Sequence, residues 1–501
     1  MCNGLFAAAS EVDRHVSLPA IILALTLPLA TIAGCSDSGG DSDDADDSDD
    51  AQASADGGDG DGSAGSQLSG GVTWHQNIAP VVAEHCVSCH TEGGIAPFAM
   101  DTYGQTSMWA ELMASATASG LMPPWHAIET DECQSLPPLR HDARLDEATI
   151  DLFRAWADAG APEGDAGNAA ALPQPPSLGL ADPTVTLTMG GEVTVEQVGG
   201  DLDHFHCMRL DPGNTEDVYL EALQVITGNR AILHHVLVYA DPNSASDSFG
   251  PEGVERDCNG GTGVSDPDVH LIGAWVPGSL PAEPPDGVRT VLEAGTKVIM
   301  QVHYHATGAG PETDDATGLA LRWSTQRPRY VSRMTLVGNF RTEAAGLMPG
   351  PADDGPQGTR FLIPAGATDH TEDMVYTVPT FSDRADVRVW TIANHMHKVG
   401  VSMRAWIERD GEDDVCLLDT PRWDFDWQRL YEYDVPIEQA PEVRSGDRLR
   451  IRCTYDNSLD NPGVVEALAE VGEDAPRDVR LGEGTLDEMC LAGVGIGVGL
   501  K

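Results

Sequence analysis

Five histidines and one methionine that could bind metal ions are spread between residues 234 and 489 of the sequence. Imidazole binds copper in both of its oxidation states, and the soft thioether of methionine favours Cu(I). A set of five imidazoles and one thioether therefore suits two separate copper ions better than one zinc ion. The six residues are His234, His235, His303, His395, His397 and Met489.

A haem-attachment motif, Cys86-x-x-Cys89-His90, lies closer to the N-terminus. In a C-x-x-C-H pattern the two thiols bond covalently to haem vinyl groups, and the histidine supplies the proximal ligand. Helix-forming sequences flank the motif, NIAPVVAEHC leading into it and LDEATIDLFRAWADAGAP closing the segment. The alternative is a redox-active dithiol or a small disulfide-linked domain, which would give no role to His90 or to Met122 in LMPPW.

This segment resembles the small class of c-type cytochrome domains, in which a methionine on the loop between the two helices is the sixth haem ligand. The resemblance implies a covalently bound haem c, and we assign the sixth position to Met122. A methionine on a helical face packs in a core more often than it binds a metal. The rival methionines are Met100, Met108 and Met113.

The sequence after residue 168 has the alternating pattern of β-strands. Segments such as DVYLEALQVI, TKVIMQVHYH, DVRVWTIANHMH and DRLRIRCTY alternate apolar and polar residues, and turn-forming clusters separate them. Many short strands over so long a stretch indicate β-sandwiches, and the length suggests two. We therefore expect a mainly β protein, with two tandem antiparallel jelly-roll-like β-sandwiches preceded by a small all-α cytochrome c domain.

The spacing of the histidines sets conditions on these strands. In NHMH, His395 and His397 are two residues apart, so on a strand they face the same side and can bind one ion. His234 and His235 are adjacent, and a regular strand would point them to opposite faces. Their joint binding to one ion requires a strand end or a β-bulge. The alternative is that one of the two is an ordinary core or surface imidazole.

The region from about residue 180 to 498 resembles the copper type II, ascorbate-dependent monooxygenases, the family of peptidylglycine alpha-hydroxylating and dopamine beta-hydroxylating enzymes. The resemblance implies insertion of one oxygen atom of dioxygen into a substrate C–H bond, with the other atom leaving as water. Each of two coppers would supply one electron. The ligands matched to the electron-donating copper are His234, His235 and His303. The catalytic ligands matched to the dioxygen-binding copper are His395, His397 and Met489.

The resemblance also implies cysteine pairs. Cys453 in RCTY and Cys490 in DEMC match one disulfide of the family, and Cys207 with Cys258 match another. The sequence leaves open whether the remaining Cys133 and Cys416 pair with each other. The family does not require His305, which shares a strand face with His303, so we expect it beside the metal site or at the surface.

Three positions depart from the peptide-hydroxylating enzymes. Ala393 stands where those enzymes have an arginine that grips the substrate carboxylate, and Leu491 and Gly493 replace an asparagine and a tyrosine that touch the substrate. These departures argue against peptidylglycine as the substrate. No acidic residue for a catecholamine can be placed, which leaves a smaller or more apolar molecule as the expected substrate.

The N-terminus reads as an export signal followed by a tether. An arginine precedes an apolar run that ends in Ile-Ala-Gly-Cys at residues 32–35, a sequence that resembles a bacterial lipobox. Cys35 would then carry the lipid, whereas a plain secretory signal with an incidental cysteine is the alternative. Residues 36–70 are mostly Asp, Ser, Gly and Ala, which cannot form a core. We expect a lipid-anchored protein of the cell envelope, at the outer membrane or the periplasmic face.

Charge excludes one class of partner. The chain has 80 Asp plus Glu against 29 Lys plus Arg, a balance that argues against nucleic acid. The expected partners are dioxygen, a small-molecule substrate, the membrane through the lipid anchor, and an electron donor. That donor would be an ascorbate-like reductant or a component of a respiratory chain.

The sequence therefore predicts a copper-dependent monooxygenase, an oxidoreductase with two copper ions and haem c, in which the haem relays electrons to the copper. The alternative is a non-catalytic copper and haem electron-transfer or copper-binding lipoprotein. A zinc hydrolase ranks last, because the sequence has no H-E-x-x-H helix and gives zinc no use for Met489. The expected parts are a signal peptide (1–35), a linker (36–70), a cytochrome c domain (71–168), and copper-binding sandwiches (169–328 and 329–501).

Overall fold

The computed structural model describes residues 71–501 apart from short gaps at 175–178, 199–201, 259–260, 340–345, 352–358, 483 and 485–486. The predicted signal peptide, Cys35 and the acidic linker lie outside the described residues. Among the helices that are described, none has both the length and the apolar character needed to cross a membrane.

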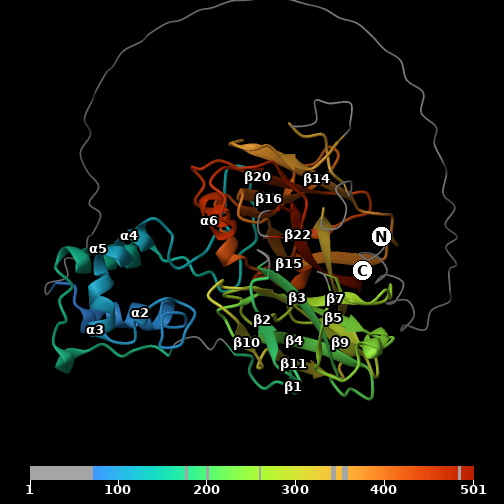
Figure 1. Cartoon of the computed structure of the whole chain (residues 1–501), viewed down its shortest axis with the longest axis horizontal. Coiled ribbons are helices and arrows are strands. Elements are labelled where there is room, and N and C mark those ends of the chain that lie inside the picture. The colour runs from blue at the N-terminus through green and yellow to red at the C-terminus, as the bar shows by residue number, and fades with distance from the viewer. Residues whose placement is uncertain are drawn as a thin grey trace, which may run out of the picture. The chain divides into compact units, whose positions relative to one another are not determined.

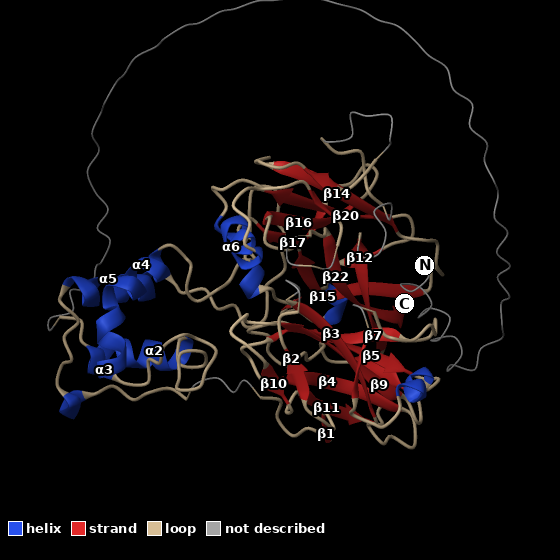
Figure 2. Cartoon of the chain, viewed as in Figure 1, coloured by secondary structure: helices blue, strands red, loops and turns tan. Residues whose placement is uncertain are grey.

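The expectation of a mainly β protein is confirmed. Figure 2 shows strands through most of the described chain after residue 180, with helices mainly in the N-terminal segment. The jelly-roll connectivity and the cytochrome class of the helical segment stay predictions.

The N-terminal segment is helical and has a core of its own. Ile78, Phe153 and Trp156 are fully buried in it. Its last helix begins where the Asp146 side chain accepts a hydrogen bond from the Thr149 backbone, which caps the first turn. The elements are η1 Trp74–Ile78, α2 Ala79–His85, α3 Tyr103–Thr106, η2 Ser107–Trp109, α4 Ala110–Ala118, α5 Glu147–Asp158 and η3 Ala166–Asn168.

The chain between α4 and α5 packs against the C-terminal β-region. Trp125, Cys133 and Leu136 are buried in the core of the C-terminal β-region rather than among the helices. A disulfide joins Cys133 to Cys416 on β17, a link across 283 residues of sequence. We call residues 124–144 the strap, because they fasten the helical segment to the β-region.

The first β-region carries the histidines of the first cluster. Its five-stranded sheet has the order β6-β3-β9-β5-β7, with all neighbours antiparallel (Figure 1). These strands are β3 Asp203–Leu210, β5 Leu233–Asp241, β6 Glu255–Asp257, β7 His270–Trp275 and β9 Lys297–His305. The other elements of this region are β1 Val185–Thr188, β2 Val193–Val195, β4 Val218–Ile226, η4 Ala245–Phe249, β8 Val288–Leu292, β10 Glu312–Asp314 and β11 Gly318–Ser324.

The second β-region contains a four-stranded sheet of order β14-β20-β16-β17 and most of a larger sheet. The four strands are β14 His370–Thr377, β16 Gly400–Glu408, β17 Val415–Thr420 and β20 Arg448–Tyr455. The remaining strands are β12 Tyr330–Gly338, β13 Leu362–Ile363, β15 Ala385–His395, β18 Tyr431–Glu432, β19 Glu442–Val443, β21 Val479–Arg480 and β22 Leu491–Leu500. The helices are η5 Phe425–Trp427, η6 Ile437–Gln439 and α6 Pro462–Val471.

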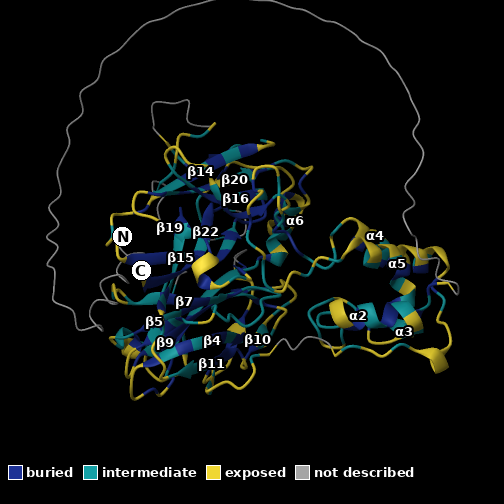
Figure 3. Cartoon of the chain, turned by 180° about the vertical axis from the view of Figure 1, so that it is seen from behind, coloured by how far each residue is buried: buried dark blue, intermediate teal, exposed yellow. Residues whose placement is uncertain are grey.

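One sheet crosses the boundary that we expected near residue 328. Its order is β1-β11-β4-β8-β12-β22-β15-β18, with β19 paired to β15, and β8 pairs with β12 in parallel. Most residues of the central strands β15 and β22 are buried, and Figure 3 draws buried residues in dark blue. The two β-regions are therefore joined by hydrogen bonds between strands as well as by the chain itself.

Candidate metal centres

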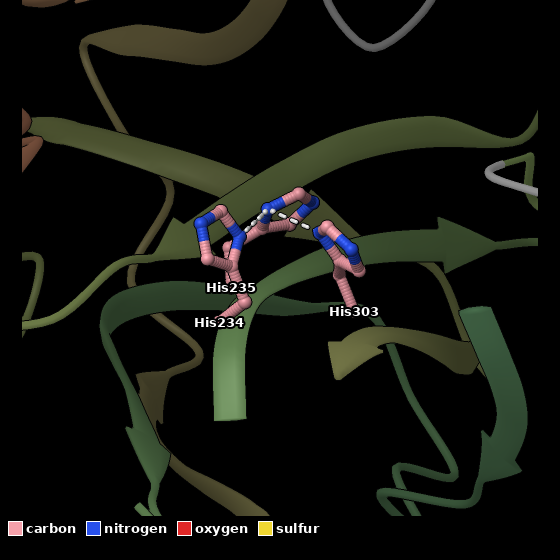
Figure 4. A group of neighbouring side chains, drawn as sticks. All are labelled: His234, His235 and His303. Atoms are coloured by element: carbon pink, nitrogen blue, oxygen red, sulfur yellow. Dashed lines mark hydrogen bonds between the residues drawn. The ribbon is translucent and has the colours of Figure 1, made fainter. Parts of the chain in front are cut away.

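Three histidines of the first β-region come together in one cluster, as Figure 4 shows. His234 and His235 lie at the start of β5, and His303 lies on the adjacent β9. One ligand nitrogen from each lies within 4.8 Å of the others. The sequence required a strand end or a β-bulge here, and the pairing of β5 with β9 does shift register between Leu233 and His235. This irregularity lets two adjacent histidines face the same point.

The nitrogens that meet are Nδ1 atoms. Nδ1 of His235 lies 3.1 Å from that of His234 and 3.3 Å from that of His303. Nε2 of His303 lies 3.0 Å from Oδ1 of Asp203, a carboxylate that accepts, so the ring donates from Nε2 and its Nδ1 carries a lone pair. Imidazole nitrogens that converge from three rings are the arrangement that a bound metal ion requires.

Burial keeps these rings uncharged. It lowers the pKa of His234 and of His235 well below the ordinary 6.5, and the neighbouring histidines lower both further. Burial opposes ionisation of Asp203, but its hydrogen bonds and charge interactions with His303 and His305 outweigh that effect and hold its pKa below the ordinary value. The cluster is thus three neutral ligands with one carboxylate behind them.

His395 and His397 form the second cluster. Their ring centroids are 5.3 Å apart and the rings are nearly perpendicular, at 85°. The expectation that both lie on one strand is wrong, because β15 ends at His395 and His397 lies beyond it. The backbone N–H groups of His397, Val399 and Gly400 donate to the Glu488 carboxylate, which holds the chain in a turn at this point.

The two rings of the second cluster are held by their Nδ1 atoms. Nδ1 of His395 donates to Oε1 of Gln428 at 2.6 Å, and Nδ1 of His397 donates to the backbone oxygen of Asp487 at 3.0 Å. The amide of Gln428 is oriented by its own donation to the oxygen of Phe425. Both rings therefore carry their lone pairs on Nε2, the opposite nitrogen from the first cluster. Burial lowers the pKa of His395 to about 3.

Met489 is buried and is fixed by its backbone. Its N–H donates to Oε2 of Glu488 at 3.0 Å, and its oxygen accepts from the Tyr455 hydroxyl at 2.6 Å. The next residue, Cys490, forms a disulfide with Cys453. Since Oε2 of Glu488 also accepts from the His397 backbone, Met489 and His397 share one hydrogen-bond acceptor.

An aromatic side chain lies between the two clusters. The Phe425 ring centroid is 4.9 Å from that of His234 and 5.8 Å from that of His397. Trp423, two residues earlier, donates from its indole to the His397 oxygen at 3.0 Å. The short segment 423–428 thus touches ligand candidates of both clusters.

The three positions that depart from the peptide-hydroxylating enzymes lie together beside His395. Leu491 on β22 is the register partner of His395, and Gly493 is the partner of Ala393. These positions bring only small or apolar groups to this side of the second cluster. A cavity of about 840 Å³ opens beside His397, and its lining includes Trp423 and Phe425.

The cysteines and the histidine of the predicted haem motif lie close together in the chain after α2. Cys86 and Cys89 are free thiols on one turn after α2, and burial raises the pKa of Cys86 to about 12. Nδ1 of His90 donates to the Phe98 oxygen at 3.0 Å, which leaves Nε2 as the ligand atom. Met122 is half-buried after α4, and no described contact joins it to His90. Its assignment as sixth ligand stays a prediction.

The cysteine pairs implied by resemblance are confirmed. Disulfides join Cys207 to Cys258 and Cys453 to Cys490. The two cysteines that sequence left open, Cys133 and Cys416, form a third.

Several residues that support the clusters were missed at the sequence level. Asp203, Gln428 and Phe425 had no motif to mark them, because their contacts depend on the fold. Glu488 did stand in the DEMC motif, where only Met489 and Cys490 were given roles. His305, expected beside the first cluster, donates from Nδ1 to Asp203 at 2.9 Å.

The described residues form a mainly β protein with one group of three histidines that could hold a metal ion and a second pair of neighbouring histidines. No family model matches the chain. The chain is 24% identical over 282 residues to the human protein "Putative DBH-like monooxygenase protein 2", covering 55% of this chain and 48% of that protein. It is 24% identical over 274 residues to the mouse "DBH-like monooxygenase protein 2", covering 53% and 38%. The chain therefore spans about half, or less, of the length of these relatives.

The similarity is distant, and both relatives are named as DBH-like monooxygenases. Among solved structures, a tandem CBM22 domain of Paenibacillus barcinonensis Xyn10C covers 63% of this chain and 97% of its own length, with 9% identity and a TM-score of 0.16. That score is too low to carry any argument about the fold.

Proposed function

We propose that the chain is a copper-dependent monooxygenase that inserts one oxygen atom of dioxygen into a C–H bond of a small-molecule substrate. The observation that carries this proposal is the pair of histidine clusters, one in which three Nδ1 atoms converge and the other with its lone pairs on Nε2. Copper bound there would supply dioxygen activation and one-electron transfer, with the second oxygen atom leaving as water.

The two sites would divide the work. His234, His235 and His303 would hold the copper that stores an electron, with Asp203 orienting His303. The catalytic ligands of the dioxygen-binding copper would be His395, His397 and Met489, whose thioether favours Cu(I).

The surroundings of the second site support an apolar reacting group. Ala393, Leu491 and Gly493 offer no charge beside His395. The cavity next to His397 has a mixed lining, in which Trp423 and Phe425 are accompanied by one lysine and four acidic residues. A substrate would enter this cavity and place an uncharged C–H bond near the metal. A carboxylate-bearing peptide finds no arginine at position 393.

The haem c would be the internal electron source. The free thiols of Cys86 and Cys89 and the oriented ring of His90 fit covalent haem attachment, with Met122 as the assigned sixth ligand. We propose that this haem reduces the copper held by the first cluster. Rapid mixing of prereduced haem with Cu(II) protein should show haem oxidation, and a haem that stays reduced would count against the relay.

The test of the function is metal analysis of the full chain made in a host that attaches haem. We expect two coppers per chain, a type 2 Cu(II) electron paramagnetic resonance signal and a sharp reduced alpha band. Met489→Ile should abolish donor-dependent oxygen consumption yet keep the first copper. Unchanged turnover in that variant would refute the catalytic assignment.

The non-catalytic alternative rests on the same three substituted positions near His395. If they record a lost hydroxylase activity, the protein would bind both metals and exchange electrons without consuming oxygen. Oxygen uptake coupled to donor oxidation separates the two functions. Cys35 anchorage in the cell envelope belongs to either one, and labelled palmitate in the mature chain would test it.

A further inference from the structure

The two chain segments that carry the second site's ligands meet at one side chain, Glu488. Its Oε2 accepts from the backbone N–H of His397 at 2.7 Å and of Met489 at 3.0 Å. Its Oε1 accepts from Val399 at 2.9 Å and Gly400 at 3.1 Å. One carboxylate therefore binds four backbone donors, on both sides of the site.

These contacts replace strand pairing at the point where the ligands lie. The turn after β15 and the approach to β22 run through residues 396–399 and 487–490, outside any named strand. Buried backbone N–H groups need acceptors, and Glu488 supplies one to four of them. Without it, the His397 turn and the Met489 segment would lose the acceptor that joins them.

Glu488 is also a fully buried acid without a cationic partner among the described residues. It is 0% exposed, and within the described part of the chain no cationic side chain forms an ion pair with it. Burial is the larger effect on its pKa and raises that pKa to about 8, although its hydrogen bonds from four backbone N–H groups act to lower it. The four hydrogen bonds offset part of the cost of burying this polar group.

We propose that Glu488 is the positioning residue of the second site, which brings His397 and Met489 into one ligand set through its hydrogen bonds to both backbones. This inference rests on the proposed function, because it takes His395, His397 and Met489 as ligands of one copper ion. The inference assigns a role to Glu488 itself, because its hydrogen bonds hold the Met489 segment next to His397, which lies far from Met489 in the sequence.

The neutral isostere Glu488→Gln tests this. An amide keeps the volume but turns one acceptor into an NH₂ donor, which would face backbone N–H groups. In the full-length protein loaded with copper, we expect the variant to keep the first copper and its type 2 signal. At the second site, copper affinity should fall by about tenfold or more, and the copper–sulfur contribution to the Cu(I) X-ray absorption spectrum should be lost.

The matched control is Glu372→Gln, which neutralises another fully buried glutamate of the same β-region, one hydrogen-bonded to His370. It should keep the copper–sulfur signal. If Glu488→Gln does not fold, as judged by its thermal midpoint and first-site copper, Glu488→Asp decides. The shorter acid keeps the carboxyl group but cannot reach all four donors, so we expect weaker second-site binding.

The inference is overturned if folded Glu488→Gln has wild-type second-site affinity and an intact copper–sulfur signal. If Glu488→Gln does not fold, the same result in Glu488→Asp overturns it. The proposed function fails differently. In that case the wild-type protein itself would bind fewer than two coppers or show no sulfur neighbour, whatever the variants do.

Discussion

At the scale of single residues, the first cluster depends on a carboxylate that is not itself a ligand candidate. Asp203 accepts from Nε2 of His303 and from Nδ1 of His305, and this fixes the His303 tautomer. Asp203→Asn should reduce copper affinity at the first site by about 10-fold to 100-fold, the usual effect of losing such a partner. Competition with a copper chelator would measure it.

Asp257→Asn is the control for this prediction, since Asp257 lies at the edge of the same sheet, outside the cluster, and is exposed. It should leave affinity unchanged. Equal losses in both variants would show that charge anywhere on the sheet, rather than the contact to His303, sets the affinity.

Burial of the histidines predicts how the metal-free protein responds to acid. The pKa values of His234, His235 and His395 lie below the ordinary 6.5, that of His395 at about 3. Below pH 6.5 the unfolded chain therefore binds protons that the folded chain does not, and the free energy of unfolding falls. Each such histidine contributes up to about 1.4 kcal/mol per pH unit.

Urea denaturation of the metal-free protein at pH 7.5, 6.0 and 5.0 would measure this loss. The variant His395→Gln should lose less stability over the same interval, because it has one fewer histidine to protonate on unfolding. A pH dependence identical to wild type would contradict the shifted pKa of His395. Saturating copper should raise the free energy of unfolding at each pH, because the metal binds the neutral rings of the folded protein.

At the scale of elements, the segment around η5 orients His395, although this segment belongs to a different part of the chain from β15. Gln428 accepts the Nδ1 proton of His395. Gln428→Ala should weaken copper binding at the second site by about tenfold or more, without effect on the first. Gln428→Glu, which keeps an acceptor, should retain most of the affinity. Copper titration with the first site already filled would distinguish them, and equal affinity in all three proteins would refute the role.

The same scale shows what sequence could and could not predict. The β5 bulge followed from the two-residue period of strands, because adjacent histidines cannot face one ion without it. The end of β15 before His397 could not be predicted in this way. The acceptor of the His397 N–H, Glu488, lies 91 residues further along the chain. Asp203 escaped for the same reason, being 100 residues from His303. Ligand types are visible in a sequence, whereas the groups that orient them become neighbours only on folding.

At the scale of the whole molecule, the Cys133–Cys416 disulfide fastens the strap to the second β-region. The strap also buries Trp125 against Tyr431, with ring centroids 5.1 Å apart, so the helical segment is held by a covalent link and by packing. Replacing both cysteines by serine should lower the free energy of unfolding by about 2–4 kcal/mol. It should also expose the strap to proteolysis, because the packing alone must then hold it.

Glu132→Gln is the matched control, since it changes the residue beside Cys133 and removes only an ion pair of the exposed Glu132 carboxylate with Arg404. Such pairs contribute about 0–1 kcal/mol, so that variant should unfold and resist protease as the wild type does. Urea midpoints and the rate of limited proteolysis within residues 124–144 would be compared. If the serine variant resists cleavage as well as Glu132→Gln does, the packing of Trp125 and Leu136 suffices, and the disulfide is not what keeps the helical segment attached to the β-region.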